Sequence, residues 1–187
     1  MSESIGCLFS GLVKLVKSLY EHYTCNKVEA IILLTGKTSL CKQVQAKDQN
    51  SLVCDWEEHL RMQVSAEDAK RISDLESRGE SASLIIYPLT KKALAELRQN
   101  FRFRRIILVS SDLAMMKYLG IKPKLILTPS SEFYSIIQSR ITDPQEKTIL
   151  DRLRTDILVA SKNPVPFNSW EALTDIACNT LKLIRKL

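Results

Sequence analysis

The amino-acid sequence predicts an α/β protein, an α/β sandwich built on a largely parallel sheet of five or six short strands. Short apolar runs with the composition of buried strands recur along the chain and alternate with segments whose apolar residues follow helical spacing. The chain has 187 residues, 45% of them hydrophobic and 26% charged, which is ordinary globular composition and enough to bury one substantial core. We therefore expect a single domain, residues 1–187.

An amphipathic segment precedes the first predicted strand. Apolar residues recur at helical spacing between residues 5 and 23, with Lys14, Lys17 and Glu21 on the other side. Two lysines on the polar face are few for a membrane anchor, so we expect a helix that covers the sheet or makes a homodimer contact. The predicted α/β core spans 28–187.

The core elements follow in alternation. Strands are predicted at 30–34, 51–54, 83–87, 106–109, 125–127 and 157–160. Helices are predicted from 37, at 65–78, 91–100, 113–119 and 133–140, from 143 to about 154, and at 170–184. Ser65 is a predicted N-cap, Gly79 follows a predicted helix end, and Asn163 to Pro166 reads as a rigid turn.

Charge and cysteine content restrict the class of protein. The net charge of +6 and the pI near 9.1 favour anionic partners without identifying one. The five cysteines form no C-x-x-C pair and only two histidines accompany them, so no metal site is expected, and we interpret them as reduced core residues of an intracellular protein, cytoplasmic or nuclear. No apolar run approaches the roughly 20 residues of a membrane span, and residues 1–4 lack the basic start of a secretory signal.

The junction after the first strand carries the most informative motif. The apolar run 30–34 leads into Thr35-Gly36-Lys37-Thr38-Ser39, and a helical pattern follows. Strand, glycine turn, Gly-Lys-Thr and helix is the order of a P-loop, and the sequence here resembles P-loop nucleoside and nucleoside-monophosphate kinases. The resemblance implies a three-layer α/β/α fold over 28–187. It also implies phosphate binding by Gly36, Lys37, Thr38 and Ser39.

Two features depart from the pattern of that family. The full motif G-x-x-x-x-G-K-[ST] has a glycine five residues before Gly36, where this sequence has Ile31, so the loop that wraps phosphates is shortened. The alternative for this stretch is a tight turn with Ser or Thr as the N-cap. In such kinases the strand beside the first one ends in an Asp that organises Mg²⁺, whereas the predicted strand 83–87 ends at Tyr87-Pro88.

Asp55 is the candidate catalytic residue. It follows the second predicted strand, at the sheet edge where ligands of open α/β proteins bind. It resembles in position the carboxylate that takes the substrate hydroxyl proton in many P-loop kinases. Alternatively, Asp55 caps the next turn, and Glu57, Glu58 and His59 face solvent.

The densest basic patch surrounds Phe101 and Phe103. Its cations could contact phosphates while the rings stack on bases, which predicts nucleic-acid binding. The alternative is a helix end with dipole-matched cations and core-facing phenylalanines. The patch consists of Lys91, Lys92, Arg98, Arg102, Arg104 and Arg105.

Two functions stay open at this point. Phosphoryl transfer depends on positioning and charge neutralisation, so a kinase-like chain without the wrapping loop, the magnesium carboxylate and an arginine lid retains little activity. Residues 140–154 lie where such kinases carry a lid, but they contain no glycine hinge and are expected to form a structural helix. The first hypothesis is therefore an inactive binding module that needs no cofactor and binds nucleic acid, protein or a second copy.

The alternative is a divergent nucleoside or nucleotide kinase that uses ATP and Mg²⁺. In that case the resemblance implies that Lys37 binds phosphate and Asp55 acts as the base. Thr38 or Ser39 would ligate magnesium, and arginines among 98–105 or 140–154 would close on the transition state.

Overall fold

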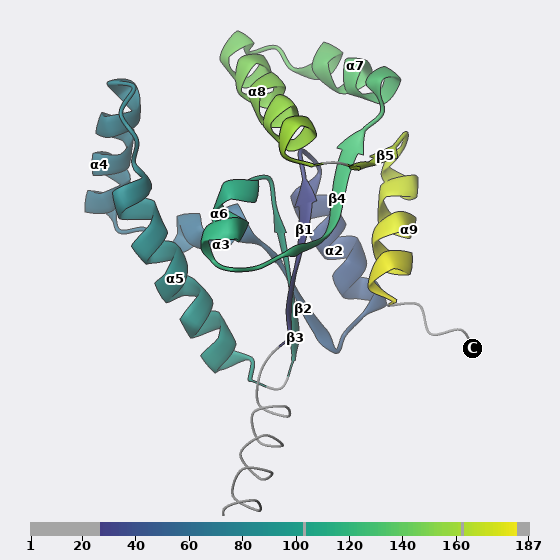
Figure 1. Cartoon of the computed structure of the whole chain (residues 1–187), viewed down its shortest axis with the longest axis horizontal. Helices are drawn as coiled ribbons and strands as arrows, with labels where there is room; N and C mark the ends of the chain where they lie inside the picture. Colours follow the sequence, from purple (N-terminus) through teal and green to yellow (C-terminus); the bar gives the residue numbers. More distant parts are fainter. Residues whose placement is uncertain (1–26, 103, 162, 183–187) are drawn as a thin grey trace, which may run out of the picture.

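The computed structural model describes residues 27–102, 104–161 and 163–182, so the helix predicted at 5–23 lies outside the described residues. Five strands form one sheet in the order β2-β3-β1-β4-β5, and every neighbouring pair is parallel (Figure 1). The strands are β1 (Val28–Leu33), β2 (Ser51–Asp55), β3 (Arg105–Ser110), β4 (Pro123–Pro129) and β5 (Val165–Phe167). The prediction of an α/β fold with a parallel sheet is confirmed.

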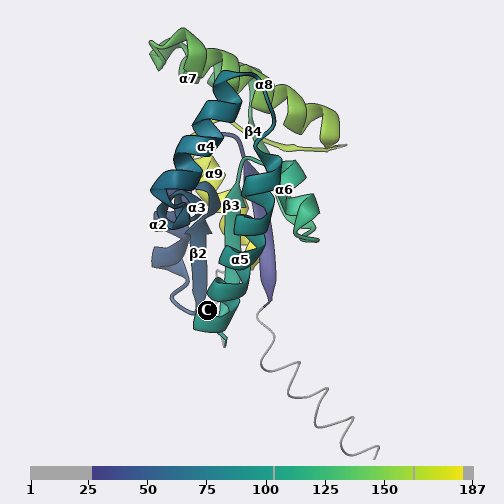
Figure 2. The same cartoon turned by 90° about the vertical axis from the view of Figure 1, so that its left-hand side faces the viewer.

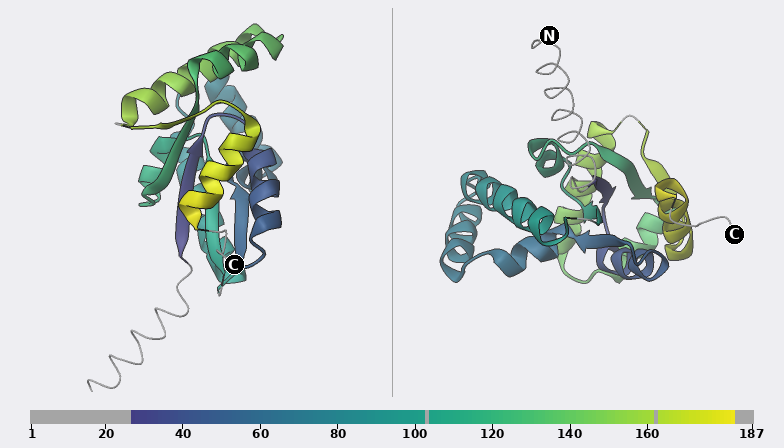
Figure 3. Two further views of the ribbon diagram at one scale, coloured as in Figure 1. Left: turned by 90° about the vertical axis from the view of Figure 1, so that its right-hand side faces the viewer. Right: turned by 90° about the horizontal axis from the view of Figure 1, so that it is seen from below.

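Helices cover both faces of the sheet. They are α2 (Lys37–Lys47), α3 (Trp56–Gln63), α4 (Ala66–Ser77), α5 (Ser83–Asn100), α6 (Leu113–Tyr118), α7 (Ser131–Arg140), α8 (Pro144–Ala160) and α9 (Trp170–Leu181). Helices α2 and α9 pack side by side on one face, and α6 lies on the other (Figure 3, left panel). Helix α5 runs along that other face beside β3, and α4 stands outside it (Figure 2). Of the described helices, none is long and apolar enough to cross a bilayer.

The central strand explains why a continuous apolar run is needed. Ile31 and Leu33 of β1 point towards α2 and α9, while Ala30 and Ile32 point towards α5, α6 and α8. All four side chains are fully buried. A strand covered on both faces has no position where a polar side chain reaches water, so the alternation typical of half-exposed strands is absent.

The prediction of a strand at 83–87 is wrong, because these residues form the first turns of α5. Ile85 and Ile86 donate their backbone N–H groups to the carbonyl of Ala82, in helical fashion. Leu84 is 90% exposed, so the apolar run is not a core segment. Pro88 lies inside the helix, and the turn around it is supported by the Thr90 hydroxyl, which donates to the Ile86 carbonyl over 2.8 Å.

The predictions for 157–160 and 163–166 are also wrong. Residues 157–160 continue α8, and only Ile157 of the four is buried. A short apolar run does not by itself distinguish a strand from a helix, and here the seventeen-residue helix continues to Ala160. The predicted turn instead leads into β5, a short edge strand that tolerates Pro166.

The order of the strands in the sheet determines which residues lie near the turn between β1 and α2. Strand β3, not residues 83–87, lies beside β1 on one side, and β4 lies on the other. The carboxyl ends of parallel strands meet at one edge of the sheet, so the segments after β1, β2 and β3 come together there.

Candidate functional site

The turn between β1 and α2 is short. Leu34, Thr35 and Gly36 are the only residues between the strand and the helix. Gly36 has φ +80° and is the N-cap of α2, so the cap is a glycine and not the predicted Ser or Thr. No side chain among the described residues caps this helix, and the backbone N–H of Leu40 donates to the Gly36 carbonyl over 2.9 Å. The phosphate-binding prediction therefore rests on the start of a helix rather than on a loop.

An indole ring covers this turn. A Cβ added to Gly36 would lie 2.5 Å from Cζ3 of Trp170 and 3.1 Å from Cε3, so the ring is in close contact with the glycine. Trp170 is the first residue of α9, held there because Ser169 caps the helix and accepts from the Ala172 N–H. The turn thus has a bulky aromatic group on the side of α9.

Trp170 belongs to an aromatic cluster at the carboxyl edge. The ring of Phe133 meets the Trp170 ring edge-on, with centroids 5.2 Å apart, and meets Phe167 in the same way at 5.8 Å. Edge-to-face pairs at these spacings stabilise by about 0.5–1.5 kcal/mol beyond the area that they bury. The cluster fixes the position of the indole on Gly36.

The structure brings Thr38 and Asp55 together. The Thr38 hydroxyl donates to Asp55 Oδ2 over 2.7 Å. The other oxygen, Oδ1, accepts from the Glu58 N–H and caps α3, as the alternative interpretation of Asp55 predicted. Lys37 is half-buried and Ser39 is exposed at the same helix start. The candidate catalytic residue and one predicted phosphate-binding residue therefore share a hydrogen bond, although seventeen positions separate them.

Glu57 does not face solvent, which corrects the alternative for that residue. Its Oε1 accepts from the Ser110 hydroxyl over 2.8 Å and from the Ser111 N–H over 2.7 Å. Its Oε2 is buried and accepts no hydrogen bond from the described residues. The side chain ties α3 to the end of β3.

Asp112 corrects the second departure from the kinase pattern. The strand beside β1 is β3, and Asp112 follows its end by two residues. The carboxylate caps α6 and accepts from the Met115 N–H over 2.8 Å. The strand beside β1 is therefore followed by a carboxylate, and not by Tyr87-Pro88 as predicted.

Three of these residues were missed or misassigned by sequence reasoning. Neither Trp170 nor Asp112 was named as a site residue, and Glu57 was considered only in the alternative in which it faces solvent. Each lies within two residues of a strand end or a cap residue, a position that points to the carboxyl edge once the strand order is known.

The residues of the predicted basic patch do not lie together on one surface. Lys91 and Lys92 are exposed on α5, where Lys91 lies 4.7 Å from the Tyr118 ring centroid and Lys92 pairs with Glu96. Arg102 is exposed beyond the end of α5. Arg104 donates to the backbone carbonyls of residues 49–51, and so anchors the loop before β2. Phe101 packs against the core, whereas Phe103 lies outside the described residues.

Arg105 is part of a charge cluster at the amino edge of the sheet, opposite the Gly36 turn. Glu29 is only 6% exposed, and its carboxylate accepts hydrogen bonds from Arg105 and from Lys124. The Lys27 Nζ lies 3.1 Å from Glu29 Oε1. Burial acts to raise the pKa of Glu29, but these three cations outweigh it and hold the pKa below its usual value of 4.5. Arg105 also donates to the Leu181 carbonyl over 2.9 Å.

Helices α7 and α8 are tied to each other. The Tyr134 hydroxyl and the Gln138 amide both donate to Asp151 Oδ1 over 2.7 Å, and the Arg154 guanidinium lies 4.1 Å from the Tyr134 ring centroid. Burial, followed by Asp151, raises the pKa of the Tyr134 hydroxyl to about 12. Of the segment 140–154 predicted as a structural helix, residues 144–154 lie in α8, whereas Arg140 is the last residue of α7.

The residues at the carboxyl edge do not fit an enclosed triphosphate. Only three residues separate β1 from α2, and the indole of Trp170 already contacts Gly36. Within the described ranges, no group of three or more His, Cys, Asp or Glu side chains is arranged to hold a metal ion. A phosphate could reach the start of α2, but main-chain amides cannot surround it there.

Comparison with known proteins identifies the type of fold. No protein-family model matches the sequence, and no curated protein matches it. Among solved structures, a sugar kinase from Janibacter sp. HTCC2649 in its unliganded form matches with a TM-score of 0.50 at 16% identity, covering 86% of this chain and 95% of that one. A thymidylate kinase from Candida albicans matches with a TM-score of 0.49 at 13% identity, covering 85% and 93%. At these identities the likeness concerns the fold, which is P-loop kinase-like, as predicted.

Proposed function

We propose that this P-loop kinase-like domain is a catalytically inactive binding module and does not transfer phosphate from ATP. The observation that supports the proposal is the contact between the Trp170 indole and Gly36. Any residues added to widen the turn would have to displace a ring that two phenylalanines hold in place.

A P-loop acts mainly by positioning and by stabilising charge. Catalysis of phosphoryl transfer depends on donors aimed at the charge that develops in the transition state, and a single such donor is worth about 10²–10³ in rate. A P-loop supplies several main-chain N–H groups at once. Here the turn contributes Leu34, Thr35 and Gly36 and then becomes helix. Even a bound nucleotide would lack most of that stabilisation.

A divergent nucleotide kinase is the second candidate, and two observations favour it. The Thr38 hydroxyl donates to Asp55 Oδ2 over 2.7 Å at the carboxyl edge, and Asp112 follows the strand beside β1. In that case Lys37 would bind phosphate and Asp55 would act as the base. The hydrogen bond also has a purely structural role, because it joins the start of α2 to the end of β2.

Calorimetric titration of the full chain with ATP or GTP in excess Mg²⁺ tests the proposal. We expect no binding tighter than millimolar, and no difference between the wild type and Lys37→Ala. The matched control is Lys42→Ala, an exposed lysine five residues further along α2. Micromolar binding that Lys37→Ala abolishes and Lys42→Ala leaves intact would instead establish the second candidate.

A nucleic-acid partner is tested by the salt dependence of binding. Arg104 and Arg105 hold a loop and the Glu29 cluster, so any phosphate contacts would depend mainly on exposed cations such as Lys92 and Arg102. Each lost phosphate contact lowers the slope of log K against log salt by about 0.7–0.9. If Lys92→Ser with Arg102→Ser leaves both the affinity and the slope unchanged, this surface does not bind nucleic acid.

A further inference from the structure

The amino edge of the sheet, where the strands begin, collects lysines and arginines from distant parts of the chain. Parallel strands all start at one side of their sheet, so the residues before β1, β3 and β4 come together there. The end of α9 lies beside them, because Arg105 donates to the carbonyl of Leu181 (Figure 1). We call this surface the basic edge, and its cations are Lys27, Arg104, Arg105, Lys122, Lys124 and Lys182.

The excess of positive charge in the described part of the chain is concentrated at this edge. The carboxylates that accompany the basic edge are fewer than its cations: Glu29, Asp48 and Asp175. Asp48 accepts from the Ser51 hydroxyl, and Asp175 pairs with Lys47. In the rest of the described residues, carboxylates are at least as numerous as lysines and arginines. A polyanion is therefore attracted to this side of the described structure.

Glu29 holds part of the basic edge in place. Its Oε1 lies 3.1 Å from Lys27 Nζ and 2.9 Å from Lys124 Nζ, and its Oε2 accepts from Arg105. A single carboxylate neutralises only one of these three charges. Neighbouring strands lie about 4.8 Å apart, so the three cations follow one another across about 10 Å of the edge. Because the cations are already positioned, an anion that binds them orders few further side chains.

The lysines of the basic edge are accessible. Lys27 and Lys124 keep 68% and 36% of their side-chain surface exposed, although both contact Glu29. Lys122 and Lys182 are exposed as well. The two arginines are engaged with backbone carbonyls, those of residues 49–51 and of Leu181. The lysines are therefore the groups that can contact a phosphate.

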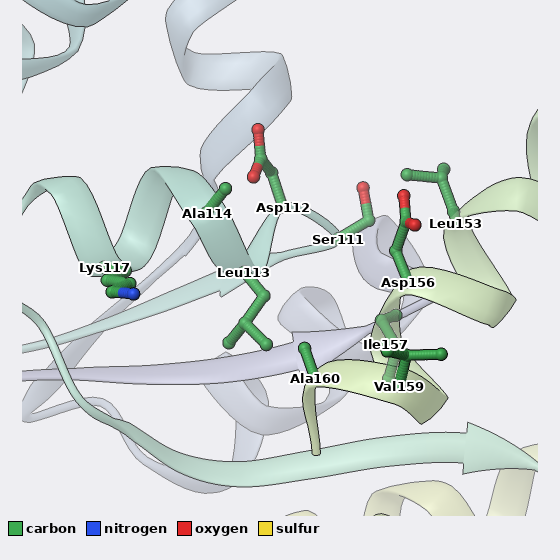
Figure 4. A pocket seen from close by; sticks show the side chains of 10 residues that line it. All are labelled: Ser111, Asp112, Leu113, Ala114, Lys117, Leu153, Asp156, Ile157, Val159 and Ala160. Atoms are coloured by element: carbon green, nitrogen blue, oxygen red, sulfur yellow. The ribbon is translucent and has the colours of Figure 1, made fainter.

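The opposite edge of the sheet has the opposite character. Asp55 and Glu57 follow β2 there, and Asp112 follows β3. The hollow between α6 and α8, of about 510 Å³, has the carboxylates of Asp112 and Asp156 on the same side (Figure 4). Carboxylates repel a phosphate, so a polyanion fits the basic edge and not the carboxyl edge.

The side chains of the basic edge favour a nucleic-acid backbone over a protein or a lipid surface. Protein interfaces have an apolar centre, and surfaces that enter a membrane insert apolar side chains. In the described residues, the large apolar side chains that are exposed lie on α3, α5, α6, α7, α8 and β5, and not at the starts of β1, β3 and β4. Phe101 packs against the core and is not available to stack on a base. The contacts offered are therefore to phosphates, which carry no sequence information.

We propose that the basic edge binds the phosphate backbone of nucleic acid without regard to base sequence. The inference rests on the proposed function, because it names the partner of the binding module. Lys27, Lys122, Lys124 and Lys182 contact phosphates, and Glu29 positions two of these lysines. The turn at Gly36 takes no part.

Fluorescence anisotropy of a labelled DNA duplex of about 20 base pairs, titrated with the full chain between about 50 and 200 mM salt, tests the proposal. Each phosphate contact contributes about −0.9 to the slope of log K against log salt, so about four contacts give a slope between about −3 and −4. We expect micromolar binding at about 50 mM salt, and an affinity for a duplex of unrelated sequence that agrees within about twofold.

The test variant removes three exposed lysines of the basic edge and leaves the ion pairs of Glu29 with Arg105 and Lys124 intact. It combines Lys27→Gln, Lys122→Gln and Lys182→Asn. Asparagine is chosen at residue 182 because the backbone there has φ +54°, which asparagine adopts more readily than most residues. We expect the slope to become shallower by about 2–3 and the affinity at about 50 mM salt to fall at least about tenfold.

The matched control removes the same charge from exposed lysines elsewhere, with Lys42→Gln, Lys70→Gln and Lys117→Gln. We expect it to change the slope by less than about one contact, about 0.9. Equal effects of the two triple variants would overturn the proposal, since net charge alone would then explain them, and so would the absence of micromolar binding by the wild type.

Vesicles that contain phosphatidylserine serve as a second probe. Binding to these vesicles without binding to the duplex would overturn the proposal and assign the basic edge to a membrane surface. Neither titration contains a nucleoside triphosphate. A failure of the DNA experiment therefore leaves the proposed lack of phosphate transfer standing, and micromolar MgATP binding in the calorimetric titration overturns that proposal without touching the basic edge.

Discussion

Replacing Gly36 by alanine probes the contact with Trp170 directly. Gly36 has φ +80°, and a Cβ there would lie 2.5 Å from Cζ3 of the indole. The left-handed backbone costs about 1–2 kcal/mol for alanine. Pushing a well-packed ring aside costs a further amount, about 1–3 kcal/mol. We expect Gly36→Ala to lower the free energy of unfolding by about 2–5 kcal/mol.

Gly79 offers a matched control. Its φ is +72°, close to that of Gly36, but an added Cβ would have no atom within 4 Å. Gly79→Ala therefore carries only the backbone cost, about 1–2 kcal/mol. Urea unfolding of both variants in the full chain measures the difference, about 1–3 kcal/mol, that belongs to the ring. Combining Gly36→Ala with Trp170→Leu should remove most of that difference.

Equal destabilisation by Gly36→Ala and Gly79→Ala would refute the reasoning. It would mean that the indole does not rest on Gly36 in solution. The turn would then be free to admit a ligand, and the proposal of an inactive module would lose its main support.

Three further changes test other parts of the structure. Glu29→Gln leaves Arg105 and Lys124 without their buried carboxylate and should lower the free energy of unfolding by about 2–3 kcal/mol at pH 7 in a denaturant titration. Because the folded-state pKa of Glu29 lies below its usual 4.5, the wild type should lose this stabilisation as the pH falls from the usual pKa through the folded one, and a Glu29→Gln chain with unchanged acid sensitivity would contradict this. Tyr134→Phe should lower the unfolding free energy by about 1–3 kcal/mol through the lost bond to Asp151, and a change below 0.5 kcal/mol, the scatter of ordinary surface substitutions, would argue against the tie between α7 and α8. The Cys41 thiol should react with iodoacetamide at pH 8 only at the slow rate at which local unfolding exposes it, because burial raises its pKa to about 12.

Much of the architecture is predictable because buried parallel strands leave a strong signal. The runs at 51–54, 106–109 and 125–127 lie within observed strands, and the run at 30–34 overlaps β1. The runs at 30–34, 106–109 and 125–127 are apolar without interruption because helices cover both faces of the sheet. Caps such as Ser169 and Asp143 mark helix starts for a local reason, since each side chain accepts from a backbone N–H two or three residues on.

The errors have a common physical cause. The runs 83–87 and 157–160 are apolar over a few residues, and such runs fit a helix as well as a strand. What decides between them is tertiary: β1 already has β3 and β4 as partners, and no further strand fits beside it. Because a strand was predicted at 83–87, it was taken as the neighbour of β1. The carboxylate of Asp112, which follows the true neighbour β3, was therefore overlooked.

The candidate site is harder to predict because it is formed by chain segments far apart in sequence. The bond from Thr38 to Asp55 follows from two strands ending at one edge, and the position of Asp55 was predictable for that reason. The contact of Trp170 with Gly36 joins residues more than a hundred positions apart, and nothing local to either residue indicates it. Likewise, only the three-dimensional arrangement places Arg105 on Glu29 and not on a free surface.

The most direct test follows the backbone amides of Gly36, Lys37 and Thr38 by NMR while MgATP is added to the full chain. The account predicts no saturable shift of these three resonances at millimolar nucleotide, beyond that produced by matched salt. Saturable downfield shifts of all three amides at micromolar MgATP would show that phosphates are bound by the main chain at this turn, and would contradict the proposal that the domain is inactive.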